Sequence, residues 1–123
     1  MPTRERVEEF IEMVVSGAHV RAITDFYHAD ASMQENLKAP RRGRETLEAH
    51  EAAALARVQK VHTHPDPVFL VDGDHVAINW TFDFTDKSGN TRRLEELALQ
   101  HWDGDRIRKE QFFYDTASAW AEV

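Results

Sequence analysis

The sequence predicts a single α+β domain in which helices from the first part of the chain pack on a mainly antiparallel sheet. Apolar residues recur at helical spacing in three segments of the first 60 residues, and most of the remainder reads as strands joined by tight turns. Helices segregated from consecutive strands are typical of two-layer α+β domains. No repeat, low-complexity segment or boundary divides the 123 residues, so we expect one domain over residues 1–123.

The first two helices are predicted by short apolar stripes. Thr3 can cap the first helix and Gly17 can end it in a left-handed turn, and between them the stripe consists of Val7, Phe10, Ile11 and Val14. A second short helix is expected over Val20–Tyr27, closed by residues 28–30. Both segments should bury one face against the sheet.

A third helix is predicted from about Arg44 to Lys60. Its apolar stripe begins at Leu47, but the positions that should continue it are His50 and Glu51. We therefore interpret these two polar residues as candidates to line a pocket between helix and sheet. The alternative is a helix end that extends past the core into solvent.

Period-2 patterns predict the strands. Residues 31–36 form a short strand with Met33 and Glu35 on one face, and residues 61–71 form an edge strand or bulge interrupted by Pro65 and Pro67. Residues 75–84 alternate cleanly, with Trp80 inside an apolar row that makes it a wall of the core or of a pocket. Residues 92–102 and 105–115 form a hairpin around Asp103 and Gly104, and the tail from residue 116 is ambiguous.

Composition excludes several classes of protein. The net charge is −7 and the one basic cluster, in residues 38–44, is short, so no nucleic-acid partner is expected. The chain has no cysteine, which rules out disulfides, thiolate metal sites and thiol nucleophiles. No signal peptide or membrane-spanning apolar run is visible, so we expect a cytoplasmic protein without a membrane partner.

Motifs for cofactors and metals are missing. His62 and His64 share one strand face, but a metal site needs further ligands and no pattern supplies them. Phosphate-binding and nucleophile-elbow motifs are also absent from the sequence. We expect neither a metal nor a cofactor.

Several stretches carry a family resemblance. FYHADASMQEN, VDGDHVAINWTF, LEELALQHWDGDRI and KEQFFYD resemble the helix-to-strand segment and the strand meander of SnoaL-like proteins in the NTF2-like superfamily, which includes ketosteroid isomerases. The resemblance covers roughly residues 5–115. It implies an NTF2-like cone, in which a strongly bent sheet wraps a helix around a hydrophobic pocket, and a homodimer. It does not choose among the many activities of this superfamily.

The resemblance also implies roles for individual residues. Glu35 matches the first-strand carboxylate that moves a proton in the ketosteroid isomerases. Phe10 matches a tyrosine that donates to the oxyanion, and Phe10 cannot donate. The second donor falls near Glu96 or Leu97, and Tyr114 matches an aromatic pocket residue. The sequence therefore keeps the base position and loses one donor.

The predicted hairpin suggests a second acid/base group. A two-residue turn at Asp103 and Gly104 pairs Leu97 with Glu110, which places one set of side chains together on a pocket wall: Glu95, Leu97, Leu99, His101, Arg108, Glu110, Phe112 and Tyr114. A different turn or a bulge would change this pairing. His101 beside Glu110 would form an acid/base unit. The alternative is a satisfied buried network or solvent exposure.

Glu35 has three interpretations. On an inward face beside Met33 its pKa should be raised, which suits a general base. It could also provide pocket polarity without chemistry, or pair with an arginine of the following loop. Glu51 could pair with Arg108 or Tyr114, and His50 could contact Glu35.

Two functions follow as hypotheses. The first is cofactor-free acid/base catalysis of the isomerase or cyclase type on a hydrophobic carbonyl or polyketide-like substrate, with Glu35, Glu110 and His101 moving protons. Ligand contacts would come from Tyr114, Trp80, His50, Glu51, Phe10 and Phe112. The second is a non-catalytic ligand-binding or dimerisation domain.

Overall fold

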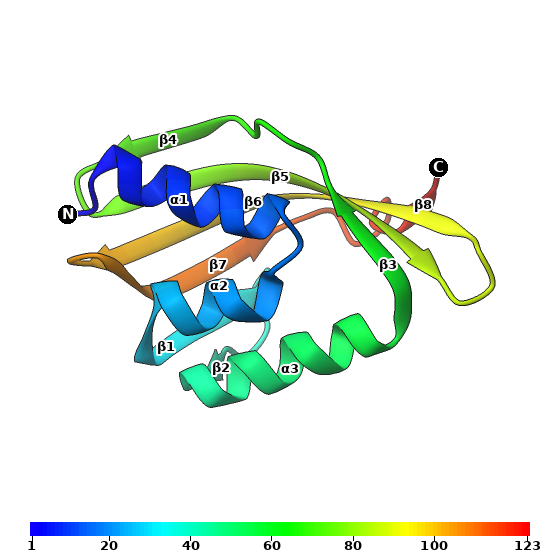
Figure 1. Ribbon diagram of the computed structural model, residues 1–123, viewed down its shortest axis with the longest axis horizontal. Helices are drawn as coiled ribbons and strands as arrows, with labels where there is room; N and C mark the ends of the chain where they lie inside the picture. The colour runs from blue at the N-terminus through cyan, green and yellow to red at the C-terminus, as the bar shows by residue number, and fades with distance from the viewer.

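The computed structural model describes all 123 residues as three helices and one curled eight-stranded sheet (Figure 1). The helices are α1 (Arg4–Val15), α2 (His19–Phe26) and α3 (Arg44–Ala56). The strands are β1 (Tyr27–Glu35), β2 (Arg41–Arg42), β3 (Val58–Thr63), β4 (Phe69–Asp72), β5 (His75–Asp86), β6 (Thr91–Asp103), β7 (Arg106–Phe113) and β8 (Ala121–Glu122). The predicted α+β class and NTF2-like cone are confirmed.

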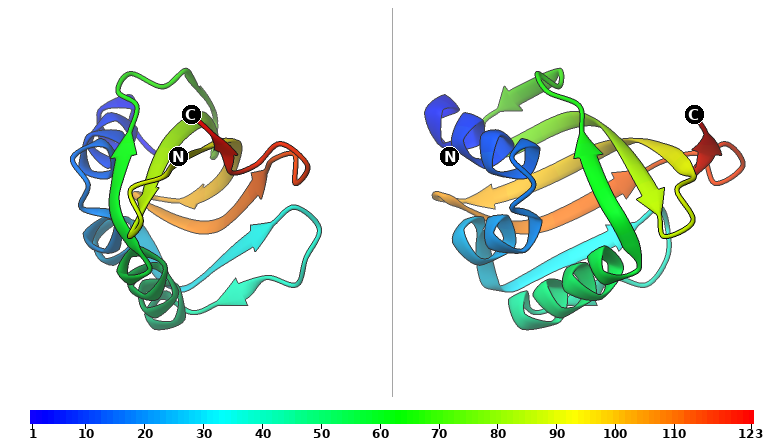
Figure 2. Two further views of the ribbon diagram at one scale, coloured as in Figure 1. Left: turned by 90° about the vertical axis from the view of Figure 1, so that its right-hand side faces the viewer. Right: turned by 45° about the vertical axis from the view of Figure 1, so that its right-hand side comes forward.

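The sheet follows the order β2-β1-β7-β6-β5-β3, with β4 added to β5 and β8 added to β6. Strand β1 runs parallel to β7, and all other pairs are antiparallel. Figure 2 shows how strongly the sheet curls and how the three helices lie along one side of it. The two termini lie at opposite ends of the long axis in Figure 1.

The core fills the end of the cone that contains α1 and α2. Thr3 caps α1 by accepting from the Arg6 N–H at 3.1 Å, and Gly17 adopts φ +94° after the helix ends. Phe10, on the buried stripe of α1, is 2% exposed and meets four aromatic rings edge-on: Phe26, Tyr27, Trp80 and Trp102. This packing seals one end of the cone.

Two element boundaries differ from the prediction. Helix α3 ends at Ala56 rather than near Lys60, because the β-branched residues from Val58 onward pair with β5 instead. Strand β1 begins at Tyr27 rather than residue 31. The Tyr27 carbonyl accepts from Arg44 and Arg106, at 3.1 and 3.0 Å, which holds the strand start against β7. The break at Pro65 and Pro67 falls between β3 and β4, as predicted.

The register of the β6–β7 hairpin also differs from the prediction. The turn residues are Gly104 and Asp105, and Gly104 adopts φ +64°. Trp102 pairs with Ile107 but His101 pairs with Lys109, so Arg108 is an extra residue in a bulge. Because side chains alternate between the two faces of a sheet, one extra residue changes which row of β6 side chains shares a face with a given row of β7 side chains. Gln100, not Leu97, therefore lies opposite Glu110.

No helix is long and apolar enough to pass through a lipid bilayer.

Candidate functional site

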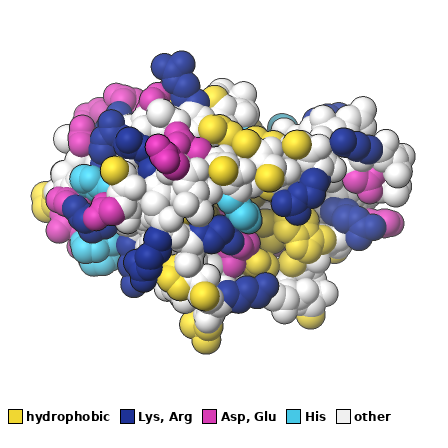
Figure 3. Space-filling model, turned by 90° about the horizontal axis from the view of Figure 1, so that it is seen from below, with side chains coloured by type: hydrophobic (Ala, Val, Ile, Leu, Met, Phe, Trp, Pro, Cys, Tyr) yellow, Lys and Arg dark blue, Asp and Glu magenta, His cyan; other side chains and the backbone are white.

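A cavity of about 490 Å³ opens between the inner face of the sheet and the helices. In Figure 3 a hollow contains hydrophobic side chains and has basic side chains beside it. Sixteen of its 26 lining residues are hydrophobic, including Ile23, Met33, Leu55, Trp80, Phe82, Leu94 and Phe112. Both the volume and the apolar wall are typical of small-molecule pockets.

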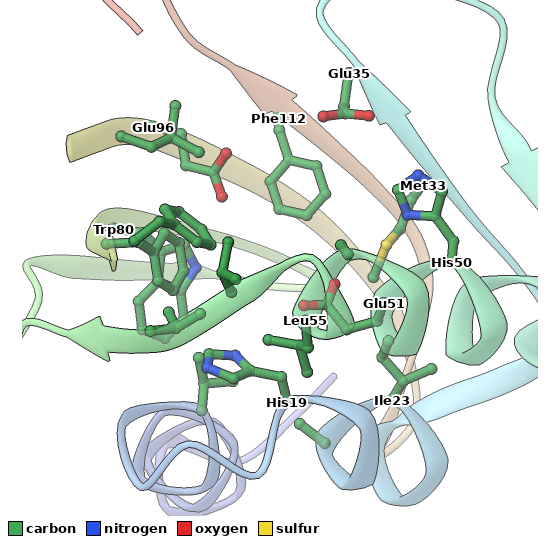
Figure 4. Close-up of a pocket in the computed structure, with 18 of the residues that line it drawn as sticks. His19, Ile23, Met33, Glu35, His50, Glu51, Leu55, Trp80, Glu96 and Phe112 are labelled. Carbon is green, nitrogen blue, oxygen red and sulfur yellow. The ribbon is translucent and has the colours of Figure 1, made fainter. Parts of the chain in front are cut away.

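Four glutamates from four different elements line this cavity. They are Glu35 on β1, Glu51 on α3, Glu96 on β6 and Glu110 on β7. Figure 4 shows the Glu96 and Glu51 side chains extending into the space beside Trp80 and Phe112, with Glu35 beyond Phe112. Only Glu35 has an ion-pair partner within the chain. The other three carboxyl groups therefore line the cavity without a neutralising partner.

Glu110 is held in a buried hydrogen-bond network. Its side chain is 1% exposed, and it accepts from the Tyr27 hydroxyl and from the Gln100 amide at 2.7 Å. The Gln100 oxygen in turn accepts from the Trp102 indole N–H at 3.0 Å. Burial raises the pKa of Glu110 to about 7, although the hydrogen bonds from Gln100 and Tyr27 oppose the rise. Glu110 therefore titrates near neutrality while remaining fixed in position.

Glu96 has no hydrogen-bond or ion-pair partner. It lies directly across from Trp80 on the neighbouring strand, at the cavity wall. Burial is the main cause that raises the pKa of Glu96 to about 8, and repulsion from the other three glutamates adds to it. At neutral pH the Glu96 carboxyl is therefore mainly protonated and carries a free O–H donor.

Glu35 behaves as an ionised carboxylate. Arg41 donates to it at 2.8 Å and the Tyr114 hydroxyl donates at 3.1 Å. Burial alone would raise the pKa of Glu35, but the Arg41 and Tyr114 contacts outweigh it and leave the pKa lowered. The expected rise in pKa is thus wrong, and the interpretation as an acid paired with an arginine of the following loop is the one observed. Tyr114 lies at the edge of the site, bound to Glu35.

His50 and Glu51 both line the cavity from α3. Burial raises the pKa of Glu51, with Arg41 opposing and Glu35 adding to the rise. The expected partners of Glu51 are wrong, because Tyr114 donates to Glu35 and Arg108 binds Asp30 and Asp103 on the outer surface, at 2.9 and 2.6 Å. His50 is exposed, and the charge of Glu35 nearby influences its pKa, which burial lowers overall.

The predicted pocket face of the hairpin is only half correct. Glu110 and Phe112 point inward. His101 lies on the outer face, where its ring stacks on that of His75 with 4.9 Å between the ring centroids. The bulge at Arg108 is the reason, because it turns the Leu97, Leu99 and His101 row of β6 outward and the Glu96, Ala98 and Gln100 row inward. His101 is therefore not part of the acid/base group that contains Glu110.

Seven of the nine predicted site residues line the one cavity: Glu35, Glu110, Trp80, His50, Glu51, Phe10 and Phe112. Tyr114 reaches it through Glu35, and His101 lies outside it. Sequence reasoning missed the buried partners Tyr27, Gln100 and Trp102. Arg41 was seen only as one residue of a basic loop. The available signals were the match of Glu96 to a donor position and the polar Gln100 in a mainly apolar row of β6.

The comparisons agree with this fold. The model of the SnoaL-like domain matches residues 7–110. A candidate SnoaL-like polyketide cyclase from Mesorhizobium loti is 22% identical with a TM-score of 0.76, over 93% of this chain and 100% of that one. The chain is also 23% identical to a hypothetical protein of ketosteroid-isomerase-like fold from Catenulispora acidiphila, solved in complex with trimethylamine. The TM-score is 0.78, over 98% of this chain and 92% of that one.

A candidate polyketide cyclase from Pseudomonas putida is also similar, with 17% identity and a TM-score of 0.77 over 100% of this chain and 98% of that one. No curated protein matches the sequence. At these identities the solved structures show the fold and not the activity. The family match covers most of the chain, so the chain belongs to the SnoaL-like domain family.

Proposed function

We propose that the cavity binds a small hydrophobic molecule with a carbonyl group and that its glutamates perform cofactor-free acid/base chemistry of the isomerase or cyclase type. The observation that carries the proposal is the unpartnered Glu96 carboxyl, which faces an apolar cavity across from Trp80. A protonated carboxyl in such a site donates to a carbonyl oxygen and stabilises the negative charge that develops there.

Glu110 is the general base in this proposal. A base works best when its pKa lies near the pH at which it operates, and Glu110 meets that condition. Tyr27 and Gln100 hold its two oxygens, so the carboxylate is positioned before the substrate arrives. Glu35 is less suited to this role, because Arg41 stabilises its ionised form.

A second candidate function is ligand binding without turnover. It is favoured by Phe10, which is buried in the core and has no hydroxyl group to donate. Without a donor at position 10, the cavity can orient a carbonyl compound through Glu96 but stabilises an oxyanion less strongly. The binding experiment below applies to both functions, and the exchange experiment separates them.

Binding is tested by thermal shift with a panel of hydrophobic ketones and enones on three variants. Glu96→Leu removes the donor and should abolish the shift, whereas Glu96→Gln keeps an N–H donor and should retain it. Glu95→Gln, an exposed neighbour on the opposite face, is the control. Saturation at a hundredfold excess over Kd should stabilise the protein by about 2.7 kcal/mol. Equal shifts for Glu96→Leu and the parent protein would contradict the proposal.

Catalysis is tested with the ketones that bind. Proton abstraction next to the carbonyl exchanges that hydrogen with D₂O, and NMR detects the exchange. Exchange that the parent protein accelerates and Glu110→Gln loses, with binding retained, supports acid/base catalysis. Binding without accelerated exchange supports the non-catalytic function.

A further inference from the structure

One carbonyl oxygen can be bound by one carboxyl donor, but three glutamates without ion-pair partners line the cavity. Glu51, Glu96 and Glu110 face the same cavity, and no Lys, Arg or His side chain forms an ion pair with any of them. Each nearby carboxyl makes it harder for the next to ionise. A cation in the cavity would remove this repulsion, because opposite charge favours the ionised form of every glutamate that faces it.

Aromatic rings flank Glu96 on both neighbouring strands. Trp80 on β5 lies directly opposite it, and Phe112 on β7 is paired with Ala98, one diagonal step away. The aromatic row continues along β5 from Trp80. The ring centroids of Trp80 and Phe82 are 5.5 Å apart, and those of Phe82 and Phe84 are 6.0 Å apart. Clusters of aromatic rings recognise quaternary ammonium groups, because ring faces are electron-rich, and a carboxylate among the rings adds the opposite charge.

The basic residues of the cavity do not occupy this position. Arg41 is bound to Glu35, and Arg92 lies 3.7 Å from Glu122 of β8. Arg57 and Arg92 are exposed, and the Arg57 guanidinium donates to its own helix at the Ala53 carbonyl. None of them forms a hydrogen bond or ion pair with Glu96. A cation at Glu96 would therefore meet carboxyl groups and rings.

We propose that the cavity also binds a hydrophobic organic cation, an ammonium group with apolar substituents, whose charge lies at Glu96 between Trp80 and Phe112. This ligand class goes beyond the proposed function and depends on the cavity but not on carbonyl chemistry. The apolar substituents would contact the wall formed by Leu55, Phe82 and Leu94.

The two ligand classes respond to pH in opposite directions. The groups that face Glu96 are Glu110 on β7, Glu35 on β1 and Glu51 on α3, and the cavity is also lined by Arg41, by His50 and by His19 of α2, whose pKa is lowered by burial. Raising the pH ionises Glu110 and then Glu96, which strengthens binding of a cation with a fixed charge. The same change removes the O–H donor on which a neutral carbonyl ligand depends.

The test compares phenyltrimethylammonium with its neutral isostere tert-butylbenzene, by NMR titration of the Trp80 indole N–H signal. The proposal predicts that the ammonium compound binds at least about tenfold more tightly, a difference of about 1.4 kcal/mol. Its affinity should rise as the pH is raised through the range in which Glu110 and Glu96 ionise. Glu96→Gln should lose the preference and Glu95→Gln should retain it.

Equal binding of the two compounds, or weaker binding of the ammonium compound at higher pH, overturns this inference and leaves the proposed function standing. Binding of a ketone but of neither test compound does the same. If neither compound binds and no ketone binds, the proposed function fails with it. The pH dependence of the unmodified protein keeps the test valid if Glu96→Gln folds poorly.

Discussion

Among single residues, Glu96 is distinguished by a carboxyl group that lines the cavity and that the fold leaves without a partner. An unpaired carboxyl at a largely apolar wall is destabilising when ionised, and proteins keep such groups mainly at functional sites. Glu96 has this character, whereas Glu35 on the first strand, the first candidate from the sequence, is neutralised by Arg41. Glu96 on β6 is therefore a stronger candidate for the functional acid than Glu35 on β1.

The first prediction concerns Glu96→Gln and the pH dependence of stability. The pKa of Glu96 is raised from 4.5 to about 8, so the folded state binds more protons than the unfolded state between these values. The free energy of unfolding should therefore fall as pH rises through this window. Glu96→Gln removes that loss and should be more stable than the parent at high pH, by on the order of 1–3 kcal/mol.

Urea unfolding across this pH range measures the effect, with Glu95→Gln as the control on the outer face of the same strand. The variant and its parent should converge in stability as the pH falls below 4.5, where the unfolded as well as the folded state of the parent holds the proton. Parallel pH profiles for parent and Glu96→Gln would contradict the burial of this group.

The second prediction concerns Glu110→Ala. This change leaves the Tyr27 hydroxyl and one Gln100 N–H without acceptors in the core. Unpaired buried donors and the new cavity should together reduce the free energy of unfolding by about 2–4 kcal/mol. Chemical denaturation gives the value, and Lys109→Ala at the neighbouring exposed position should change it by less than about 0.5 kcal/mol.

At the scale of elements, α3 divides its inward residues between core and cavity. Leu47 is 1% exposed in the packed part, whereas Leu55 is only partly buried and lines the open cavity. Leu47→Ala should therefore cost about 2–4 kcal/mol, and Leu55→Ala closer to 1 kcal/mol because it loses fewer contacts. Urea denaturation of both variants compares the costs, and equal losses would show that the cavity is filled by packing.

Element types were predictable from periodicity, and positions inside the hairpin were not. The clean alternation of β5 placed Trp80 inward correctly, because a half-buried strand of this kind leaves no ambiguity. On β6 both rows contain apolar residues, Leu97 and Leu99 in one and Leu94 and Ala98 in the other, so the pattern cannot choose the inner face. The bulge at Arg108 decides it, and no residue type in the sequence marks that bulge.

Contacts between distant segments could not be predicted from the sequence either. The network through Tyr27, Gln100 and Glu110 joins residues that are up to 83 positions apart, through a parallel β1–β7 pairing that local patterns do not reveal. Glu51 was identified from a break in its helical stripe, because a polar residue on an apolar face is a local signal. Glu96 was named only through the family resemblance.

At the scale of the whole molecule, the outer face of the sheet has an apolar patch that we define as Leu70, Leu97, Leu99 and Phe113. All four side chains are exposed, and Leu97 pairs across strands with Phe113. Burial of such a patch provides a driving force for association, and the homodimer remains a prediction. Sedimentation equilibrium should show a dimer that Leu99→Lys converts to a monomer with an unchanged circular dichroism spectrum. A monomeric parent protein would contradict it.

Glu96 should be a protonated acid that faces the cavity at neutral pH, and its titration can be observed directly. A ¹³C NMR titration that follows the Glu96 side-chain carboxyl carbon reports its own ionisation. We expect a midpoint near the raised pKa of about 8. A midpoint near 4.5, the ordinary value for a glutamate, would show a carboxylate that is ionised at neutral pH and would remove the O–H donor on which the proposed carbonyl ligand depends.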